Sequence, residues 1–369
     1  MKTSYKILAV AITIIFSLVG CGHSDKIATE EMKEIKIGVL VGSGGVEDRA
    51  LNELAWEGIR QFTDRFPKAT AQIVVPRGDS LEDRLKAAED LLVVKSDLII
   101  ALGMEYSEVV KILQDKHSET SFILIDGELN KINSNTVVVN YLDQETAFLA
   151  GVAAALQSSN NKLGFIGGRE EPAIERAGLG FIAGIAYVNN KYGTGSEIVE
   201  FKFQESFNNI KEGQEIAQSM FDSGVDSIYV FARGTGIGAM NEAKARLERD
   251  EKVYIIGSER DQYGVGKLID ERSVTLTSTL RHVNLTLYEL LDAYSLNEFP
   301  GGQSFQKNLR NNGISLPEQN YNFTNETKIK VKEVEDLIRR GDLLIPSTSV
   351  ELIQMIESFG YSVELSPSF

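Results

Sequence analysis

The chain has 369 residues, and its 53 Asp and Glu residues exceed its 38 Lys and Arg residues to give a formal net charge of −15. This excess of acid argues against a nucleic-acid binder, because phosphate recognition needs a basic face. Hydrophobic residues make up 43% and charged residues 25% of the sequence, which is typical of a globular protein, and the length indicates about two domains. One Cys and three scattered His residues exclude a disulfide framework and a multi-thiolate metal site, so we expect no metal and no cofactor.

The first 20 residues have the pattern of a signal peptide. Lys2 and Lys6 give it a positive start, and the apolar run over 7–19 is too short for a comfortable membrane span. The run ends in Leu-Val-Gly-Cys, which resembles the bacterial lipobox, so we expect Cys21 to be the lipidated first residue of the mature protein. The alternative is an ordinary signal peptide that happens to contain a Cys. Diacyl modification would anchor the protein to the cell membrane on its extracytoplasmic face, and the polar residues 21–34 would act as a tether.

After the tether, short apolar segments alternate with amphipathic ones. Strands are predicted over 36–41, 72–76, 98–102, 122–126 and 136–140, and again over 163–166, 197–203, 227–231 and 253–256. Helices are predicted between most of them, at about 47–66, 81–94, 107–116, 175–189, 209–223 and 238–250. Strict succession of strand and helix indicates parallel βαβ units. We therefore predict an α/β fold of two doubly wound lobes.

The two series of strands and helices have similar lengths, so they divide the mature chain into two lobes. We assign residues 35–143 and about 262–300 to the N-terminal lobe, and residues 144–261 and about 301–369 to the C-terminal lobe. The late segments 273–278 and 284–296 are too short for a third lobe and are expected to complete the first two. Because ligands of open α/β sheets bind at the carboxyl ends of strands, two lobes joined by a hinge predict a ligand cleft between them.

Polar, aromatic and glycine residues follow the predicted strands at that edge. The candidates for ligand contact in the first series are Asp48, Leu51, Asn52, Gly103, Met104, Tyr106 and Asp126. The candidates in the second series and after it are Phe207, Phe231, Arg233, Gly234, Glu259, Asp261 and Arg281. Asp48 and Asn52 lie one helical turn apart, and capping of that helix is their structural alternative. Tyr229 and Phe231 lie two residues apart on one strand and therefore on the same face, so core packing is the alternative for them.

Two enzyme classes have partial support. Gly234, Gly236 and Ala239 match G-x-G-x-x-A between a strand and a helix, and Glu259 lies near the position of the ribose-binding acid in a dinucleotide fold. The lipobox and the mid-chain position of this motif argue against a dehydrogenase. Glu259 and Asp261 could serve as the paired acids of a glycosidase, but binding of ligand hydroxyl groups fits them equally well. Since no Walker A motif and no G-x-S-x-G elbow occur, we expect no enzymatic activity.

Ordered blocks along the whole mature chain resemble one family. They include GGVEDRALNELAWEGI at 44–59, DLIIALG at 97–103, FILIDG at 122–127, ETAFLAGVAAAL at 145–156, LGFIGG at 163–168, ERAGLGFIAGIAYVN at 175–189, ARGTGIGAMNEAK at 232–244 and YIIGSERDQ at 254–262. The chain is similar to the basic membrane protein family, whose best-understood members are purine-nucleoside-binding lipoproteins of ABC transporters. The resemblance implies a type I periplasmic-binding-protein-like fold with three interlobe crossings. It also implies a nucleoside-like small-molecule ligand and ABC permease subunits as partners, and we expect a monomer.

The resemblance further implies that two aromatic rings enclose the base while acids and a basic residue hold the ribose. Here Leu51 stands at the aromatic position of the first helix, and Gly42 stands at the position of one acid. Met104 or Tyr106 could compensate, and the candidates for the second ring are Phe207, Tyr229 and Phe231. Asp126 matches the family pattern, whereas Glu259 replaces an Asp, Arg281 replaces a Lys and Arg233 replaces a Gly.

These departures gather at ligand positions while the scaffold blocks are kept, and they leave two functions open. The first is an extracytoplasmic substrate-binding lipoprotein of an ABC importer, with a shifted nucleoside-like ligand that it delivers to a permease. The second is a surface lipoprotein of the same fold that acts as a sensor, regulator or adhesion module without uptake. Stabilisation of the folded protein by a small molecule would favour the first.

Overall fold

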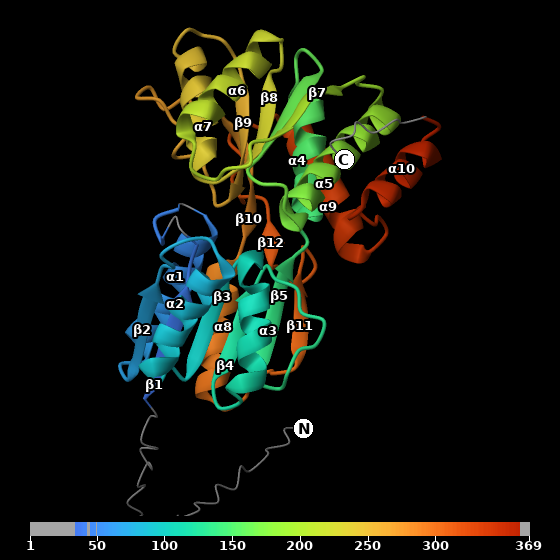
Figure 1. Ribbon diagram of the computed structural model, residues 1–369. Helices are drawn as coiled ribbons and strands as arrows, with labels where there is room; N and C mark the ends of the chain where they lie inside the picture. The colour runs from blue at the N-terminus through green and yellow to red at the C-terminus, as the bar shows by residue number, and fades with distance from the viewer. Residues whose placement is uncertain (1–33, 43–44, 49, 362–369) are drawn as a thin grey trace, which may run out of the picture. The chain divides into compact units, whose positions relative to one another are not determined.

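Two sheets of mainly parallel strands form the framework of the molecule (Figure 1). The computed structural model describes residues 34–42, 45–48 and 50–361. The predicted signal peptide, Cys21 and the tether up to residue 33 lie outside the described residues. No helix within the described ranges is both long enough and apolar enough to cross a membrane.

The first sheet has the strand order β11-β5-β4-β3-β1-β2, and all its pairs are parallel. Its strands are β1 (Ile35–Leu40), β2 (Ala69–Val74), β3 (Leu98–Leu102), β4 (Ser121–Ile125), β5 (Thr136–Tyr141) and β11 (Gln303–Lys307). The sequences of β3 and β4, LIIAL and SFILI, are apolar at almost every position and are buried along almost their whole length. Such continuous apolar strands form because helices cover both faces of a parallel sheet.

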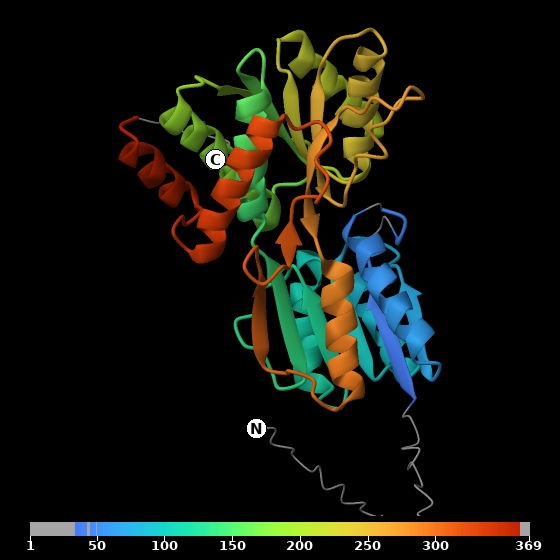
Figure 2. The ribbon, with the colours of Figure 1, turned by 180° about the vertical axis from the view of Figure 1, so that it is seen from behind.

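Four helices cover this sheet, together with the short 3-10 helix η1 (Met104–Tyr106). Helices α1 (Leu51–Arg65) and α8 (Val283–Ser295) pack against each other. Helices α2 (Leu81–Val93) and α3 (Ser107–Lys116) form a separate apolar cluster with Ile99 and Ala101 of β3, whereas α1 and α8 share theirs with the alternate residues Leu98 and Ile100. The two helix pairs therefore lie on opposite faces of the sheet, as Figures 1 and 2 show.

The second sheet has the order β12-β10-β9-β8-β6-β7, with β12 the one antiparallel member. Its strands are β6 (Lys162–Gly167), β7 (Glu197–Phe203), β8 (Ser227–Phe231), β9 (Tyr254–Glu259), β10 (Thr275–Arg281) and β12 (Ile314–Ser315). Its helices are α4 (Asp143–Gln157), α5 (Pro172–Tyr192), α6 (Ile210–Asp222), α7 (Gly234–Leu247), α9 (Asn325–Arg340) and α10 (Ser349–Ser358). The predicted α/β fold of two doubly wound lobes is confirmed.

Strand pairing corrects the predicted lobe boundaries. β10 pairs with β9 and belongs to the second sheet, although residues 262–300 are predicted for the N-terminal lobe. β11 pairs with β5 and belongs to the first sheet, although residues 301–369 are predicted for the C-terminal lobe. The chain thus passes between the sheets three times along its described course, from β5 to α4, from β10 to α8 and from β11 to β12.

Helices α4 and α5 approach each other through glycine. A Cβ on Gly184 would lie 2.1 Å from the Phe148 carbonyl oxygen, and one on Gly151 would lie 2.3 Å from the Phe181 carbonyl oxygen. Any side chain at these positions would force the two backbones apart, since the contacting atoms are main chain. The two helices are therefore closely paired, and their N-terminal segments carry the polar side chains Gln144 and Arg176.

Replacing Gly184 with Ala is expected to lower the free energy of unfolding by about 1–3 kcal/mol, because overpacking displaces backbone. Gly264 is the matched control, because a Cβ there has nothing within 4 Å and Ala should fit. Urea unfolding of both variants measures the difference. Equal midpoints for the two variants would contradict the close approach of α4 and α5.

Candidate functional site

A buried arginine joins charged residues from both sheets. The guanidinium of Arg281, at the end of β10, donates to Asp126 Oδ2 at 2.6 Å and to both carboxylate oxygens of Asp143 at 2.7 and 2.5 Å. Asp126 follows β4 of the first sheet, and Asp143 begins α4. Glu259, the last residue of β9, has its Oε1 3.7 Å from Arg281 Nη1. The predicted residues Asp126, Glu259 and Arg281 therefore meet in one cluster.

The electrostatics of the cluster show that Arg281 is fully engaged with protein groups. Burial alone would lower the pKa of Arg281, but the carboxylates of Asp126, Asp143 and Glu259 hold it well above its usual value. The guanidinium carbon of Arg281 lies 5.3 Å from the centroid of the Tyr141 ring and 5.2 Å from that of the Phe231 ring. Arg281 is only 4% exposed and orients the acids around it.

Two fully buried carboxylate oxygens of the cluster have no hydrogen-bond partner among the described residues. They are Asp126 Oδ1 and Glu259 Oε2, both buried and both unpaired within the described part of the chain. Buried hydrogen-bond acceptors are almost always paired in native proteins, so an unpaired one indicates a position where a further donor can bind. A ligand hydroxyl group is a donor of the required kind.

Backbone strain marks the same strand ends. Asp126, Arg233 and Glu259 have φ values of 57°, 47° and 66°, in the left-handed region that side-chain-bearing residues seldom adopt. Each of the three follows or ends a strand of one of the two sheets. Strained residues that carry charge are concentrated at functional sites, where the surrounding structure holds them in place.

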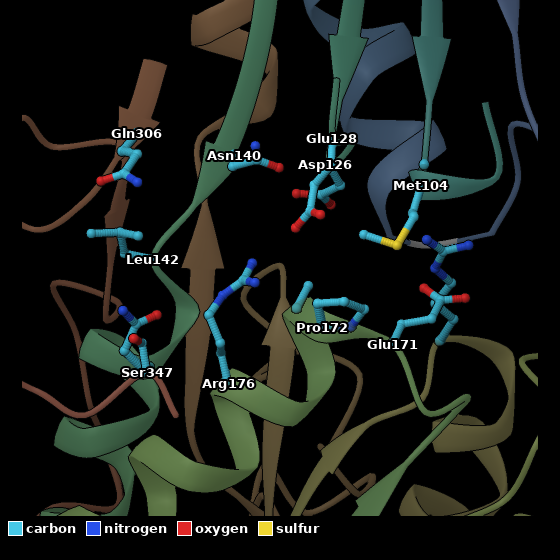
Figure 3. A pocket seen from close by; sticks show the side chains of 14 residues that line it. Met104, Asp126, Glu128, Asn140, Leu142, Glu171, Pro172, Arg176, Gln306 and Ser347 are labelled. Atoms are coloured by element: carbon cyan, nitrogen blue, oxygen red, sulfur yellow. The ribbon is translucent and has the colours of Figure 1, made fainter. Parts of the chain in front are cut away.

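A cavity of about 330 Å³ lies beside the cluster (Figure 3). The predicted residues that line it are Gly103, Met104, Asp126 and Arg233. Sequence reasoning missed the rest of the lining: Glu128, Asn140, Leu142, Gln144, Glu171, Pro172, Ala173, Arg176, Gln306 and Ser347. Position could have indicated part of this set, because residues 140–144 connect the end of β5 to the start of α4, and residues 171–176 lie at the start of α5. Gln144 Oε1 and Arg176 Nε are also buried without a partner in the described structure.

Arg233 also lines two neighbouring cavities. The second, of about 60 Å³, contains the predicted residues Asp48, Asn52, Tyr106 and Phe207. The third, of about 300 Å³, contains Glu259 and Asp261. Arg233, which directly precedes α7, thus links the surfaces on which most of the predicted contact residues lie.

Three predicted contact residues lie elsewhere. Leu51 and Phe231 are 1% and 4% exposed, pack in the hydrophobic core and line none of these three cavities, so their role as ligand contacts stays a prediction. Gly234 lines none of these three cavities and instead begins α7 close to the Phe207 carbonyl oxygen. Leu51 points inward because it is the first residue of the apolar face of α1. Phe231 points inward because β8 is covered on both faces, so that Phe231 and its neighbour Val230 are both buried, on opposite faces.

Asp48 and Asn52 serve the helix as well as the cavity. The Asp48 carboxylate accepts from the backbone N–H groups of Ala50, Asn52 and Glu53 at 2.9, 3.2 and 3.1 Å, so its capping interpretation is confirmed. Asn52 Nδ2 donates to the Gly45 carbonyl oxygen at 2.8 Å. Tyr106 donates its hydroxyl to the Val41 carbonyl oxygen at 2.7 Å. These bonds tie the described residues Val41, Gly45 and Asp48 to their neighbours in α1 and η1 beside the second cavity.

A second arginine connects helix α1 to the end of β9. Arg260 Nη1 lies 2.7 Å from Glu53 Oε1, and its Nη2 lies 2.6 Å from Glu57 Oε1. The three side chains are about one third exposed, so solvent screens these ion pairs and their contribution to stability is small.

The pKa of Glu259 predicts a pH-dependent stability. Burial raises this pKa from 4.5 to about 7, against the opposing effect of Arg233 and Arg281. Between these two values the folded protein keeps a proton that the unfolded chain releases, so the free energy of unfolding falls as the pH rises. Above pH 7 the full cost of the buried charge is present, and below pH 4.5 it is absent.

Glu259→Gln is expected to remove this component in the ligand-free protein. At pH 8 the variant should be more stable than the wild type by on the order of 2 kcal/mol, and the difference should vanish near pH 4.5. Urea unfolding of both proteins across this range measures it. A difference that is constant with pH would show that Glu259 does not titrate as described.

Two α/β lobes with a polar cavity at their strand ends define a binding protein of the type I periplasmic class. The model of the PnrA-like ABC transporter substrate-binding proteins matches residues 35–349, and the chain belongs to this family. The resemblance drawn from the sequence blocks is therefore confirmed.

Relatives cover nearly the whole chain. It is 29% identical to the "CD4+ T-cell-stimulating antigen" of Listeria monocytogenes over 92% of this chain and 96% of that protein. It is also 29% identical to the "ABC transporter nucleoside-binding protein BmpA" of Lactococcus lactis, over 94% of this chain and 99% of that protein. Among solved structures, a solute-binding protein of an ABC transporter system from Aeropyrum pernix K1 superimposes with a TM-score of 0.76 at 20% identity, over 88% of this chain and 97% of that one. That likeness supports the fold.

Proposed function

We propose that this protein binds a nucleoside-like small molecule at the strand ends of its two lobes, without chemical turnover, and delivers it to an ABC permease. The unpaired oxygens of Asp126 and Glu259 are the observation that carries the proposal. Adjacent hydroxyl groups of a ribose would satisfy both acceptors, and hydrogen bonds to charged groups are the stronger ones. The name of the Lactococcus lactis relative, a nucleoside-binding protein, supports the same ligand class.

The chemistry of the cluster favours a polyhydroxyl ligand over an anion. The positive charge of Arg281 is already paired, since its guanidinium donates hydrogen bonds to Asp126 and Asp143. The main cavity carries the acids Asp126, Glu128 and Glu171 against the bases Arg176 and Arg233. An uncharged sugar that donates hydrogen bonds suits such a lining better than a phosphate, which the acids would repel.

Calorimetric titration of the purified full-length protein in detergent with inosine, adenosine, uridine and free ribose tests this function. We expect saturable binding of at least one nucleoside with one site per chain, and a rise in the unfolding midpoint with ligand concentration. A folded protein that gives neither heat nor a shift with any of them would contradict nucleoside binding and would favour a sensor or adhesion role.

The proposed location outside the cytoplasm depends on Cys21. Replacing Cys21 with Ser removes the thiol that would carry the diacylglyceryl group. We expect the variant to leave the membrane fraction, because the acyl chains supply the anchoring free energy. Fractionation of cells that express either protein measures the change. A variant that stays in the membrane fraction would contradict lipid anchoring at this residue.

A further inference from the structure

Phe207, one of the three rings predicted as candidates to stack on a base, is already covered by arginine. The guanidinium carbon of Arg233 lies 4.5 Å from the centroid of the Phe207 ring, and that of Arg169 lies 5.4 Å from it. All three side chains line the second cavity. Arg233 also lines the main cavity and the third cavity. A ligand in any of the three cavities could therefore contact its side chain.

Arg233 keeps its hydrogen-bonding capacity. A guanidinium has five N–H donors in one plane, and a group that rests on an aromatic ring keeps those donors directed outward at its edge. Within the described residues, the Arg233 side chain makes no hydrogen bond and no ion pair, in contrast to the side chains of Arg281 and Arg260. Its strained backbone, with φ at 47°, holds this side chain where a glycine would be relaxed.

The charges around Arg233 restrict what it can bind. Burial alone would lower its pKa, but Glu259, Asp48, Glu105 and Glu171 raise it. These four acids disfavour the binding of a negatively charged ligand group next to Arg233, since like charges repel strongly in a partly desolvated site. The best partner is therefore an uncharged group that presents two adjacent acceptors to the fork of the guanidinium.

We propose that Arg233 determines base specificity by donating two hydrogen bonds to the neighbouring O6 and N7 acceptors of a 6-oxopurine nucleoside, such as inosine or guanosine. This inference rests on the proposed function, in which Asp126 and Glu259 hold the sugar. The O6/N7 edge matches the arginine fork, whereas adenine places an amino donor at position 6 against the arginine donors. Adenosine is therefore rejected by an unpaired donor rather than by size.

The test compares inosine with adenosine in calorimetric titrations of the full-length protein and three variants. The wild type should bind inosine at least about tenfold more tightly than adenosine. Arg233→Gly removes the fork and should bring the two affinities within about threefold of each other, while binding of the sugar persists. Arg233→Lys keeps the charge without the fork and should also lose most of the discrimination. Arg60→Gln, a change on the exposed face of α1, is the control and should keep the wild-type ratio.

The outcomes separate this inference from the proposed function. Equal affinities in the wild type, or a tenfold ratio that survives in Arg233→Gly, overturn the role of Arg233 while nucleoside binding stands. Failure of every nucleoside to bind the wild type overturns the proposed function, and the base specificity with it. If Arg233→Lys keeps the wild-type ratio of inosine to adenosine affinity while Arg233→Gly loses it, the positive charge accounts for the discrimination. That result would overturn the proposed pair of hydrogen bonds from the guanidinium.

Discussion

Replacing Arg281 with Met is expected to lower the free energy of unfolding by about 3–5 kcal/mol. The change removes the one cation that contacts Asp126 and Asp143 within the described structure and leaves these carboxylates buried without a counter-charge. Desolvated carboxylates either remain charged at high cost or take up protons, and both outcomes destabilise the folded state at neutral pH. The midpoint and slope of urea unfolding at pH 7 measure the loss.

Two further variants separate charge from packing. Arg272→Met removes an exposed arginine that pairs with Asp250 and Asp270, and it should cost no more than about 1 kcal/mol. Adding Asp126→Asn and Asp143→Asn to Arg281→Met should recover much of the stability, because complete removal of a buried charge network is often close to neutral. A loss below about 1 kcal/mol in Arg281→Met, or no recovery in the triple variant, would contradict the assigned network.

Replacing Glu259 with Gln is expected to weaken nucleoside binding by roughly tenfold, because the amide loses the charge that strengthens a hydrogen bond from a sugar hydroxyl. The same variant should be more stable than the wild type above pH 7, since it no longer buries a charge. Affinity and stability thus move in opposite directions, as expected where a binding site keeps an unsatisfied group for its ligand. Titration calorimetry and urea unfolding of the same preparation measure both.

The control for this change is Glu248→Gln, which removes an exposed carboxylate beyond the end of α7. It should alter neither affinity nor stability by a measurable amount. Asp126→Asn should weaken binding as Glu259→Gln does, but it should also cost stability, because Asp126 pairs with Arg281. Affinities within a factor of about three of the wild type in both site variants would contradict the hydroxyl-binding role of these acids.

The fold class and the edge of the sheets that carries the candidate site could be predicted from the residues alone. Apolar runs such as LIIAL of β3 are typical of strands covered on both faces, and their succession with amphipathic helices indicates parallel sheets. Charged residues directly after such runs, Asp126 and Glu259 among them, must then lie at the carboxyl edge. Both conclusions follow from local patterns, in which the spacing along the chain reports the environment of each side chain.

The sheet that each late segment joins, and the side chains that face the cavity, depend on contacts between elements far apart in the chain. β10 and β11 each pair with a strand distant in sequence, and no local pattern specifies such a partner. Leu51 and Phe231 lie near ligand positions in sequence but rotate into the core, whereas Arg176 and Gln144 reach the main cavity from helix N-termini. The same holds for two features of the candidate site: the unpaired oxygens of Asp126 and Glu259, and the Arg233 side chain over Phe207. Each depends on side chains from separate elements that pack together, because burial and hydrogen bonding are set by neighbours in space and not by neighbours in the sequence.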